Sequence, residues 1–222
     1  NTGILLIHGL TDSPYLFHDL SSEFHKQDLN VRTLLLPGHG TAPSALIDIK
    51  EKQWRQATNY AVRQMLKDFE RVYLGGFSTG GALLIDQLVN ENWSNAEKDK
   101  IKGLLLWSPA SRAKSDFAWA AQFVDYIPFL DYTNKSADID LAKYESFSLN
   151  AGAQVHKLMN RINDSVDNNA DNIPNVPIFV IASEVDQTIN TEATIDIVKK
   201  WHTAPNRDNR LDTMVYYGSS KS

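Results

Sequence analysis

The sequence predicts an α/β fold built on a mostly parallel sheet with helices on both faces. Apolar runs of strand length alternate with longer runs of helical spacing, which is typical of βαβ units joined by right-handed crossovers. The first strand-like run is apolar throughout, as in strands buried on both faces of a parallel sheet. The chain has 222 residues, of which 42% are hydrophobic and 22% charged. This length accommodates one sizeable core and is short for two full domains.

Each expected element follows from its own local pattern. The expected strands are apolar runs bounded by turn residues, at 3–7, 30–36, 71–75, 103–107, 177–182 and 211–217. The expected helices carry apolar residues at three- and four-residue spacing, at 13–27, 54–69, 81–90 and 191–201. The charged run 97–100 indicates a solvated turn, and the Asn/Asp-rich stretch 163–172 indicates a solvated, mobile loop.

One long segment interrupts this alternation and sets the expected domain organisation. Residues 111–175 contain aromatic clusters but no strand of the buried type, and the segment is too long for an ordinary connection. We therefore expect residues 1–110 and 176–222 to form the α/β core and 111–175 to form a helical cap insertion. Such a cap would cover the carboxyl ends of the strands, where ligands bind in open α/β sheets. The alternative is an extra packed helical layer with no role in substrate binding.

Composition argues against several classes of function. The net charge of −5 argues against nucleic acid or an anionic membrane as a partner, and no run approaches the length of a membrane span. The absence of cysteine excludes disulfides and cysteine nucleophiles. No histidine or carboxylate spacing indicates a metal site, and the glycines match neither a dinucleotide fingerprint nor a phosphate-binding loop. We expect no metal and no cofactor.

The most informative pattern is Gly76-Phe77-Ser78-Thr79-Gly80, between a strand-like run and a helical run. Alone it is weak, because glycine and serine are common in turns. Between a strand and a helix it predicts a nucleophile elbow, a sharp turn that exposes a reactive serine. We expect Ser78 to be a catalytic nucleophile, with the positive end of the following helix dipole directed at it.

A second pattern, Leu6-Ile7-His8-Gly9-Leu10-Thr11, ends the first expected strand. Acyl transfer needs preorganised N–H donors where the carbonyl oxygen becomes negative, and we expect these from the backbones of Leu10 and Thr79. We expect the His8 ring to brace this loop through hydrogen bonds and not to act as the base. His39, in Leu36-Pro37-Gly38-His39-Gly40, could be a ligand or a base, but loop bracing is favoured because no second metal ligand is spaced near it.

The loop after residues 178–182 offers the acid of a catalytic triad. A triad needs a carboxylate that orients the histidine, and in this class of arrangement the chain order is serine, acid, histidine. Asp186 fits this order and lies just after a strand end. Glu184 is the competing candidate, and Asp186 could instead be a simple helix cap.

Together these residues resemble the α/β-hydrolase superfamily, and most closely its carboxylesterases and monoacylglycerol lipases. The matching segments are 6–14, 36–40, 76–80 and 184–186, in the family's order along nearly the whole chain. The resemblance implies an α/β-hydrolase fold, ester hydrolysis through an acyl-serine without a cofactor, and a cap that shapes an acyl pocket.

The sequence departs from the family pattern at both ends. The resemblance implies a strand hairpin ahead of the first strand and a histidine after the last one, and neither is present. His202 precedes the last expected strand, His156 lies in the expected cap, and His18 and His25 lie on the first expected helix. We expect this sequence to be a fragment or a processed form, with the catalytic histidine a few residues beyond Ser222.

These observations favour a serine esterase acting on short- to medium-chain acyl esters or monoacylglycerol-like substrates. A non-catalytic, hydrolase-like binding protein and an acyltransferase or thioesterase on the same fold are the alternatives. A small-molecule ester is the expected partner, without nucleic acid or stable membrane insertion. The expected location is cytoplasmic, although a targeting segment could precede residue 1.

Overall fold

The computed structural model describes residues 1–113, 132–133, 147–184, 186, 189–208 and 211–218. The strands are β1 Thr2–Ile7, β2 Asn30–Leu34, β3 Arg71–Phe77, β4 Ile101–Trp107, β5 Tyr132–Thr133, β6 Phe147–Ser148, β7 Ile178–Ser183 and β8 Thr213–Tyr217. The α-helices are α1 His18–Lys26, α2 Glu51–Asp68, α3 Thr79–Asn90, α4 Asn95–Lys100, α6 Leu149–Asn168 and α7 Thr191–Thr203. Short 3₁₀ turns are η1 Pro14–Phe17, η2 Pro43–Leu46 and η3 Ala170–Asn172.

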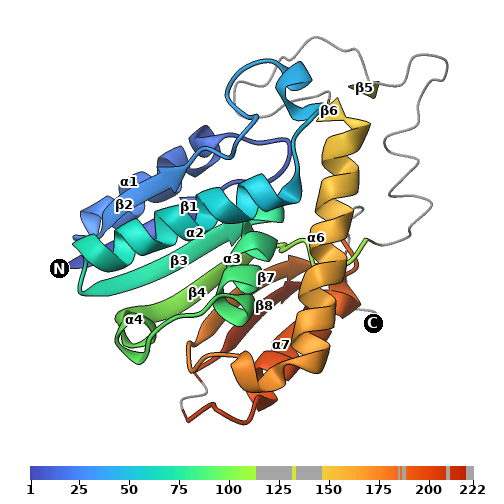
Figure 1. Cartoon of the computed structure of the whole chain (residues 1–222). Coiled ribbons are helices and arrows are strands. Elements are labelled where there is room, and N and C mark those ends of the chain that lie inside the picture. The colour runs from blue at the N-terminus through green and yellow to red at the C-terminus, as the bar shows by residue number, and fades with distance from the viewer. Residues whose placement is uncertain (114–131, 134–146, 185, 187–188, 209–210, 219–222) are drawn as a thin grey trace.

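A six-stranded sheet in the order β2-β1-β3-β4-β7-β8 forms the centre of the molecule (Figure 1). Every pairing in this sheet is parallel, which confirms the predicted α/β class. The carboxyl ends of all six strands therefore lie along one edge. The segments that follow β1, β3 and β7, where the candidate site residues are found, all leave the sheet at that edge.

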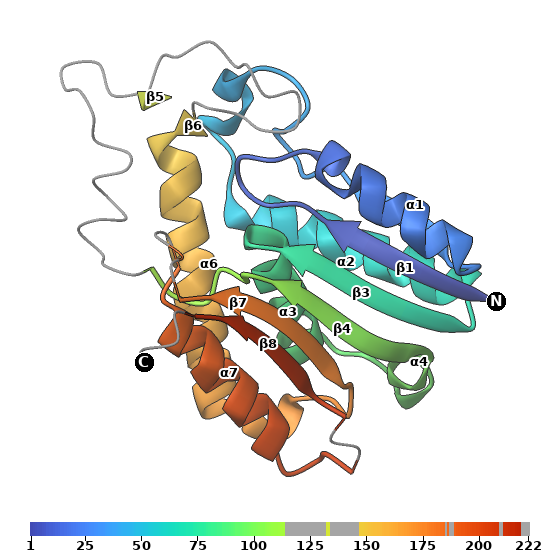
Figure 2. The ribbon, with the colours of Figure 1, turned by 180° about the vertical axis from the view of Figure 1, so that it is seen from behind.

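Helices cover the sheet from both sides, as predicted. One face packs against α2, α3, α6 and α7, and its buried core includes Leu74, Leu104 and Val180. The opposite face packs against η1 and α1 through Ile4, Leu6 and Phe17 (Figure 2). Burying apolar surface at about 25 cal/mol per Å² is the main stabilising contribution to such layers.

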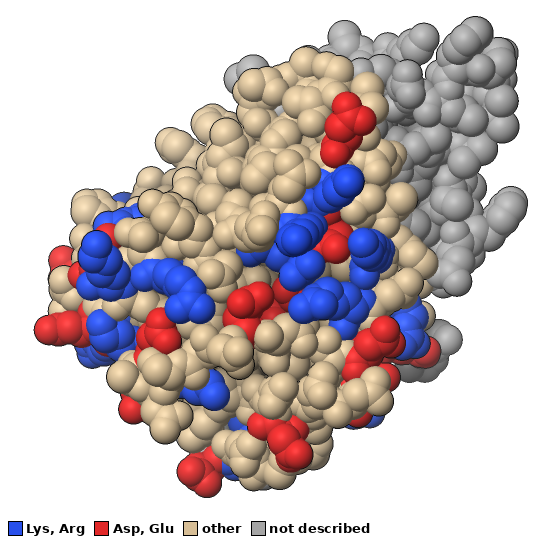
Figure 3. Space-filling model, viewed as in Figure 1, with Lys and Arg blue, Asp and Glu red and all other residues tan. Residues whose placement is uncertain are grey.

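Helix α6 is joined to the core by apolar packing and by an ion pair whose carboxylate is buried. It lies against α3, and its Val155, Leu158 and Ile162 are at most 1% exposed. Asp86 of α3 is fully buried, and its Oδ1 accepts a hydrogen bond from Arg161 Nε at 2.6 Å. Figure 3 shows basic and acidic side chains close together on this helical side of the molecule. Removing Arg161 would leave the buried Asp86 carboxylate without its ion-pair partner, whereas Arg161 itself is partly exposed to solvent.

Two local predictions were wrong. The stretch 163–172 is not a loop: α6 continues through Asn168, and η3 follows it. The Asn163 and Asn168 side chains donate to the carbonyls of Met159 and Asp164, one helical turn earlier. These contacts are compatible with helical backbone at both positions. The run 97–100 belongs to α4, whose first turn is fixed by a reciprocal capping box between Ser94 and Glu97.

The division into core and cap stays a prediction, because 114–131 and 134–146 lie outside the described residues. Within that segment, the described helix α6 packs in the core layer. For this part, the arrangement is the one expected from the alternative of an extra packed helical layer. Among the described residues, no helix is both long and apolar enough to cross a bilayer.

Candidate functional site

Ser78 stands at the turn between β3 and α3, as predicted. Its φ of 49° and ψ of −114° lie in a region that costs a non-glycine residue about 1–3 kcal/mol. Three hydrogen bonds hold this conformation: Ser78 N donates to Trp107 O at 2.9 Å, and Ser78 O accepts from Ala110 N at 2.9 Å and Ala82 N at 3.1 Å. The residue is half-buried, and therefore not enclosed in the packed interior.

The glycines on either side of Ser78 are required by close backbone contacts. A Cβ at Gly80 would lie 2.0 Å from the carbonyl oxygen of Ile7, the last residue of β1. A Cβ at Gly76 would lie 2.5 Å from the Gly80 carbonyl carbon. The first turn of α3 is thus pressed against the end of β1, and a side chain at Gly76 or Gly80 would collide with the backbone there.

The loop after β1 lies beside this turn. A Cβ at Gly9 would lie 3.0 Å from the ring of Phe77, the residue before Ser78. Leu10 is 8% exposed and follows Gly9, while Thr79 opens α3. The first N–H groups of a helix have no partner within the helix, so they are available to an anion. The loop that carries Leu10 and the helix start at Thr79 therefore lie at the ends of neighbouring strands, and the oxyanion role of both residues stays a prediction.

Two buried histidines hold this loop. His8 Nδ1 donates to Gly9 O at 2.7 Å, and His8 Nε2 accepts from Leu36 N at 3.1 Å. His39 Nε2 donates to Leu10 O at 2.7 Å. The structure thus shows the loop-bracing contacts that the sequence predicted for both rings.

The two rings are uncharged near neutral pH. Burial, reinforced by the neighbouring His39, lowers the pKa of His8 to about 3. Burial also lowers the pKa of His39. Because both nitrogens of His8 are engaged in hydrogen bonds, that ring is not available as a general base.

Trp54 completes this arrangement and was not singled out from the sequence. It is fully buried on α2, and its Nε1 donates to Pro37 O at 3.0 Å, which fixes the loop that carries His39. Its position in an apolar helical stripe indicated only a core residue, because nothing in the spacing distinguishes such a tryptophan from other core positions.

Asp186 lies beyond the end of β7, two strands from β3. Its Oδ1 accepts from Ile189 N at 2.9 Å, and its backbone N donates to Ser183 O at 3.3 Å. The strand ends between it and Ser78 are tied together, since Ser108 N donates to Ile181 O at 2.8 Å and Ser78 N to Trp107 O. Asp186 and Ser78 therefore share the carboxyl edge of the sheet, and the pairing of Asp186 with a histidine stays a prediction.

The competing acid, Glu184, is exposed and continues the pairing of β7 with β8. Its backbone N donates to Tyr217 O at 2.8 Å. A Cβ at Gly218 would lie 2.9 Å from Glu184 Oε2, so this carboxylate is directed toward the end of β8.

None of the six histidines takes the position of a triad base. His202 Nδ1 lies 2.8 Å from Asp212 Oδ2, and Asp212 Oδ1 accepts from the backbone N of Ile178, the first residue of β7. This pair is therefore at the amino edge of the sheet, opposite Ser78. His156 is on α6, and His18 and His25 are on α1.

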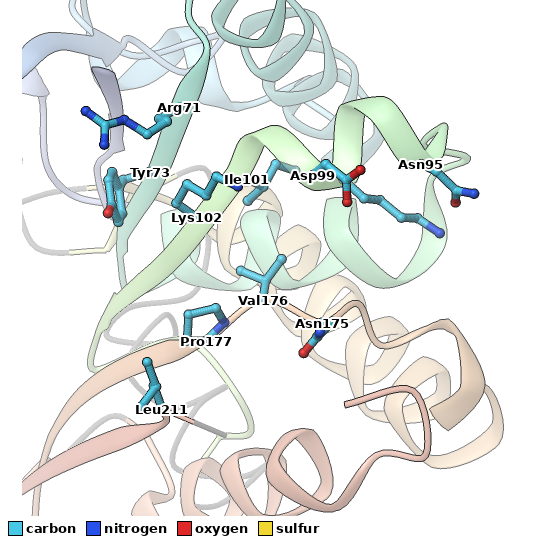
Figure 4. Close-up of a pocket in the computed structure, with 11 residues that line it drawn as sticks. Arg71, Tyr73, Asn95, Asp99, Ile101, Lys102, Asn175, Val176, Pro177 and Leu211 are labelled. Carbon is cyan, nitrogen blue, oxygen red and sulfur yellow. The ribbon is translucent and has the colours of Figure 1, made fainter. Parts of the chain in front are cut away.

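A cavity of about 730 Å³ also lies at the amino edge and is separate from the candidate site (Figure 4). It is bounded by the first residues of β3 and β4 and by Pro177 just before β7. Among the described residues, no group of three or more histidine or carboxylate side chains could hold a metal ion.

Comparisons with known proteins agree with this geometry. A family model described as "Alpha/beta hydrolase family" matches residues 4–207. No curated protein sequence matches the chain.

Several solved structures share its fold at low sequence identity. A structure of the metagenome-derived lipolytic enzymes LipS and LipT is 18% identical, with a TM-score of 0.73 over 98% of this chain and 83% of that chain. A soluble variant of monoglyceride lipase from Saccharomyces cerevisiae, bound to a substrate analogue, is 14% identical, with a TM-score of 0.72 over 98% and 77%. Monoacylglycerol lipase from Paleococcus ferrophilus is 16% identical, with a TM-score of 0.67 over 98% and 84%.

Proposed function

Because the chain belongs to the alpha/beta hydrolase family, we propose that it hydrolyses carboxylic esters through an acyl-serine intermediate formed on Ser78. The observation that carries this proposal is the strained backbone of Ser78 at the end of β3, next to the loop after β1. A serine held at positive φ against backbone neighbours is costly to fold, and such strain concentrates at functional sites.

In the proposed reaction, Ser78 Oγ attacks the ester carbonyl carbon while its proton passes to a histidine. The Leu10 and Thr79 N–H groups stabilise the oxyanion. The bond to the alcohol oxygen then breaks, and the histidine returns the proton to the departing alcohol. A water molecule, deprotonated by the same histidine, attacks the acyl-serine and releases the carboxylic acid.

Asp186 is the proposed acid that orients this histidine. The histidine itself is proposed to lie outside these 222 residues, because the described contacts of His8 and the place of His202 assign both to other roles. No cofactor takes part in these steps. The proposed substrates are short- to medium-chain acyl esters. Monoacylglycerols should be among the first substrates tested, because two of the similar structures are lipases of that class.

The second candidate is a hydrolase-like binding protein without catalysis, and a full gene product with no histidine within about ten residues of β8 would favour it. An acyltransferase or thioesterase would use the same serine. Product analysis separates these functions, since hydrolysis releases free acid, acyl transfer gives a new ester, amide or thioester, and a binding protein releases nothing.

The test uses the full gene product and p-nitrophenyl esters of two to twelve carbons. We expect turnover with the wild type and a loss of at least about 10³-fold in kcat with Ser78→Ala, as for removal of a triad member. Ser108→Ala is the matched control, because Ser108 also has positive φ and follows the neighbouring strand β4. Equal activity of the wild type and Ser78→Ala would refute the assignment of Ser78.

A further inference from the structure

We propose that His8 and His39 are positioning residues that aim the Leu10 N–H at the oxyanion by fixing the peptide groups on both sides of Leu10. This inference rests on the proposed function, because it gives the Leu10 N–H a catalytic task. The two rings would act on the chemical step through their hydrogen bonds to backbone carbonyls, without touching the substrate.

His8 controls the peptide group that contains the Leu10 N–H. The carbonyl of Gly9 and the N–H of Leu10 belong to one planar trans unit, so they point in opposite directions. His8 Nδ1 donates to this carbonyl at 2.7 Å, and Asp12 N donates to it at 3.3 Å. Both donors hold the carbonyl on one side and the Leu10 N–H on the other, and they polarise the amide toward stronger donation.

The backbone also fixes which nitrogen of His8 carries the proton. Leu36 N donates to His8 Nε2 at 3.1 Å, so Nε2 must be the acceptor and Nδ1 the donor. His8 is fully buried, and its ring lies 4.8 Å from that of His39, centroid to centroid. The ring therefore has one tautomer and little freedom to turn.

His39 controls the peptide group on the other side of Leu10. Its Nε2 donates to Leu10 O at 2.7 Å, and the residue is 4% exposed. With one carbonyl held by each ring, the two planes that meet at the Leu10 Cα are both fixed. Because a donor to the oxyanion acts only when it is already oriented, loss of either ring bond should lower the rate of the chemical step.

Asparagine and glutamine substitutions separate this role from simple packing. Asparagine places an amide near the position of histidine Nδ1, and glutamine places one near Nε2. At position 8 the required donor is Nδ1, so His8→Asn should keep kcat and His8→Gln should lose it. At position 39 the required donor is Nε2, so the order should reverse, with His39→Gln active and His39→Asn impaired.

We expect kcat to fall about 10- to 100-fold in His8→Gln and His39→Asn, with KM within about threefold, since removal of a whole oxyanion donor costs 10²- to 10³-fold. His8→Asn and His39→Gln should stay within about fivefold of the wild type. At position 8 the order of stability should be the reverse of the order of kcat. His8→Gln should be the more stable variant, because it retains an acceptor for Leu36 N that His8→Asn loses. Urea unfolding of each variant measures this separately.

The inference would be overturned if the Asn and Gln variants ranked in the same order of kcat at both positions, or if the substitutions changed KM alone. If the variants at one position do not fold, the pair at the other position decides. Trp54→Phe removes the indole N–H that holds the His39 loop and also leaves a cavity at this buried site, so its unfolding free energy is measured together with kcat. It should lower kcat about three- to tenfold, and an unchanged kcat counts against the inference. Failure of the proposed function is distinct, because the wild type itself would then release no acid from any ester.

Discussion

Replacing Gly80 with alanine tests the contact between α3 and β1 on which the site is built. The new Cβ would lie 2.0 Å from Ile7 O and 2.8 Å from His8 O. An ordinary carbon–oxygen contact is about 3.3 Å, so the first turn of α3 must retreat from β1 by roughly 1.3 Å. Because the obstacle is backbone and not a flexible side chain, we expect a loss of about 3 kcal/mol, the upper end for overpacking.

The assay is urea unfolding followed by tryptophan fluorescence, with kcat measured on the same preparations. Gly103→Ala is the matched control, because its nearest neighbour is the Tyr73 ring at 3.0 Å, which can shift by a few tenths of an ångström. We expect the control to lose less than about 1 kcal/mol. Gly80→Ala should also lose about 100-fold in kcat, because a 1 Å displacement separates Thr79 from the loop after β1. Equal stability of the two variants would refute the reasoning.

Three further predictions concern charges and the triad acid. Arg161→Met should cost about 3 kcal/mol in unfolding free energy, because Asp86 is left charged and buried, and adding Asp86→Leu should recover most of that loss in urea titrations. The pKa of His8 is about 3 when folded against 6.5 ordinarily, so between these values the unfolded state binds more protons. Stability should therefore be fully present above pH 6.5 and fall as the pH drops, by up to about 1.4 kcal/mol per pH unit, and a flat urea midpoint from pH 6.5 to 4 contradicts this. Asp186→Asn should lower kcat by about 10³- to 10⁴-fold while Glu184→Gln stays near wild type, and the reverse order would make Glu184 the acid.

The turn at Ser78 could be predicted from sequence because its geometry has few chemical solutions. A strand that passes into a helix within one residue needs glycine where backbones touch, and Gly76 and Gly80 supply it. Inner strands such as β1 were predictable for a similar reason, since burial on both faces leaves a continuous apolar run such as residues 4–7.

Other features depend on contacts between distant segments and leave no local trace. Asn163 in the middle of α6 looked like a loop residue, but its side chain bonds to Met159 O and to Ser111 O, 52 positions away. The bracing role of the two histidines was foreseeable, whereas the particular backbone group that each ring nitrogen contacts required the fold. Trp54 could not be separated from the core residues of α2 until Pro37 was placed beside it.

Mass spectrometry of the full gene product after reaction with a fluorophosphonate tests the role of Ser78 most directly. A single phosphonyl adduct is expected, on the peptide that contains Ser78, and none is expected in Ser78→Ala. An active wild-type enzyme that is left unmodified, or that carries the adduct on another serine such as Ser108, would contradict the assignment of Ser78 as the nucleophile.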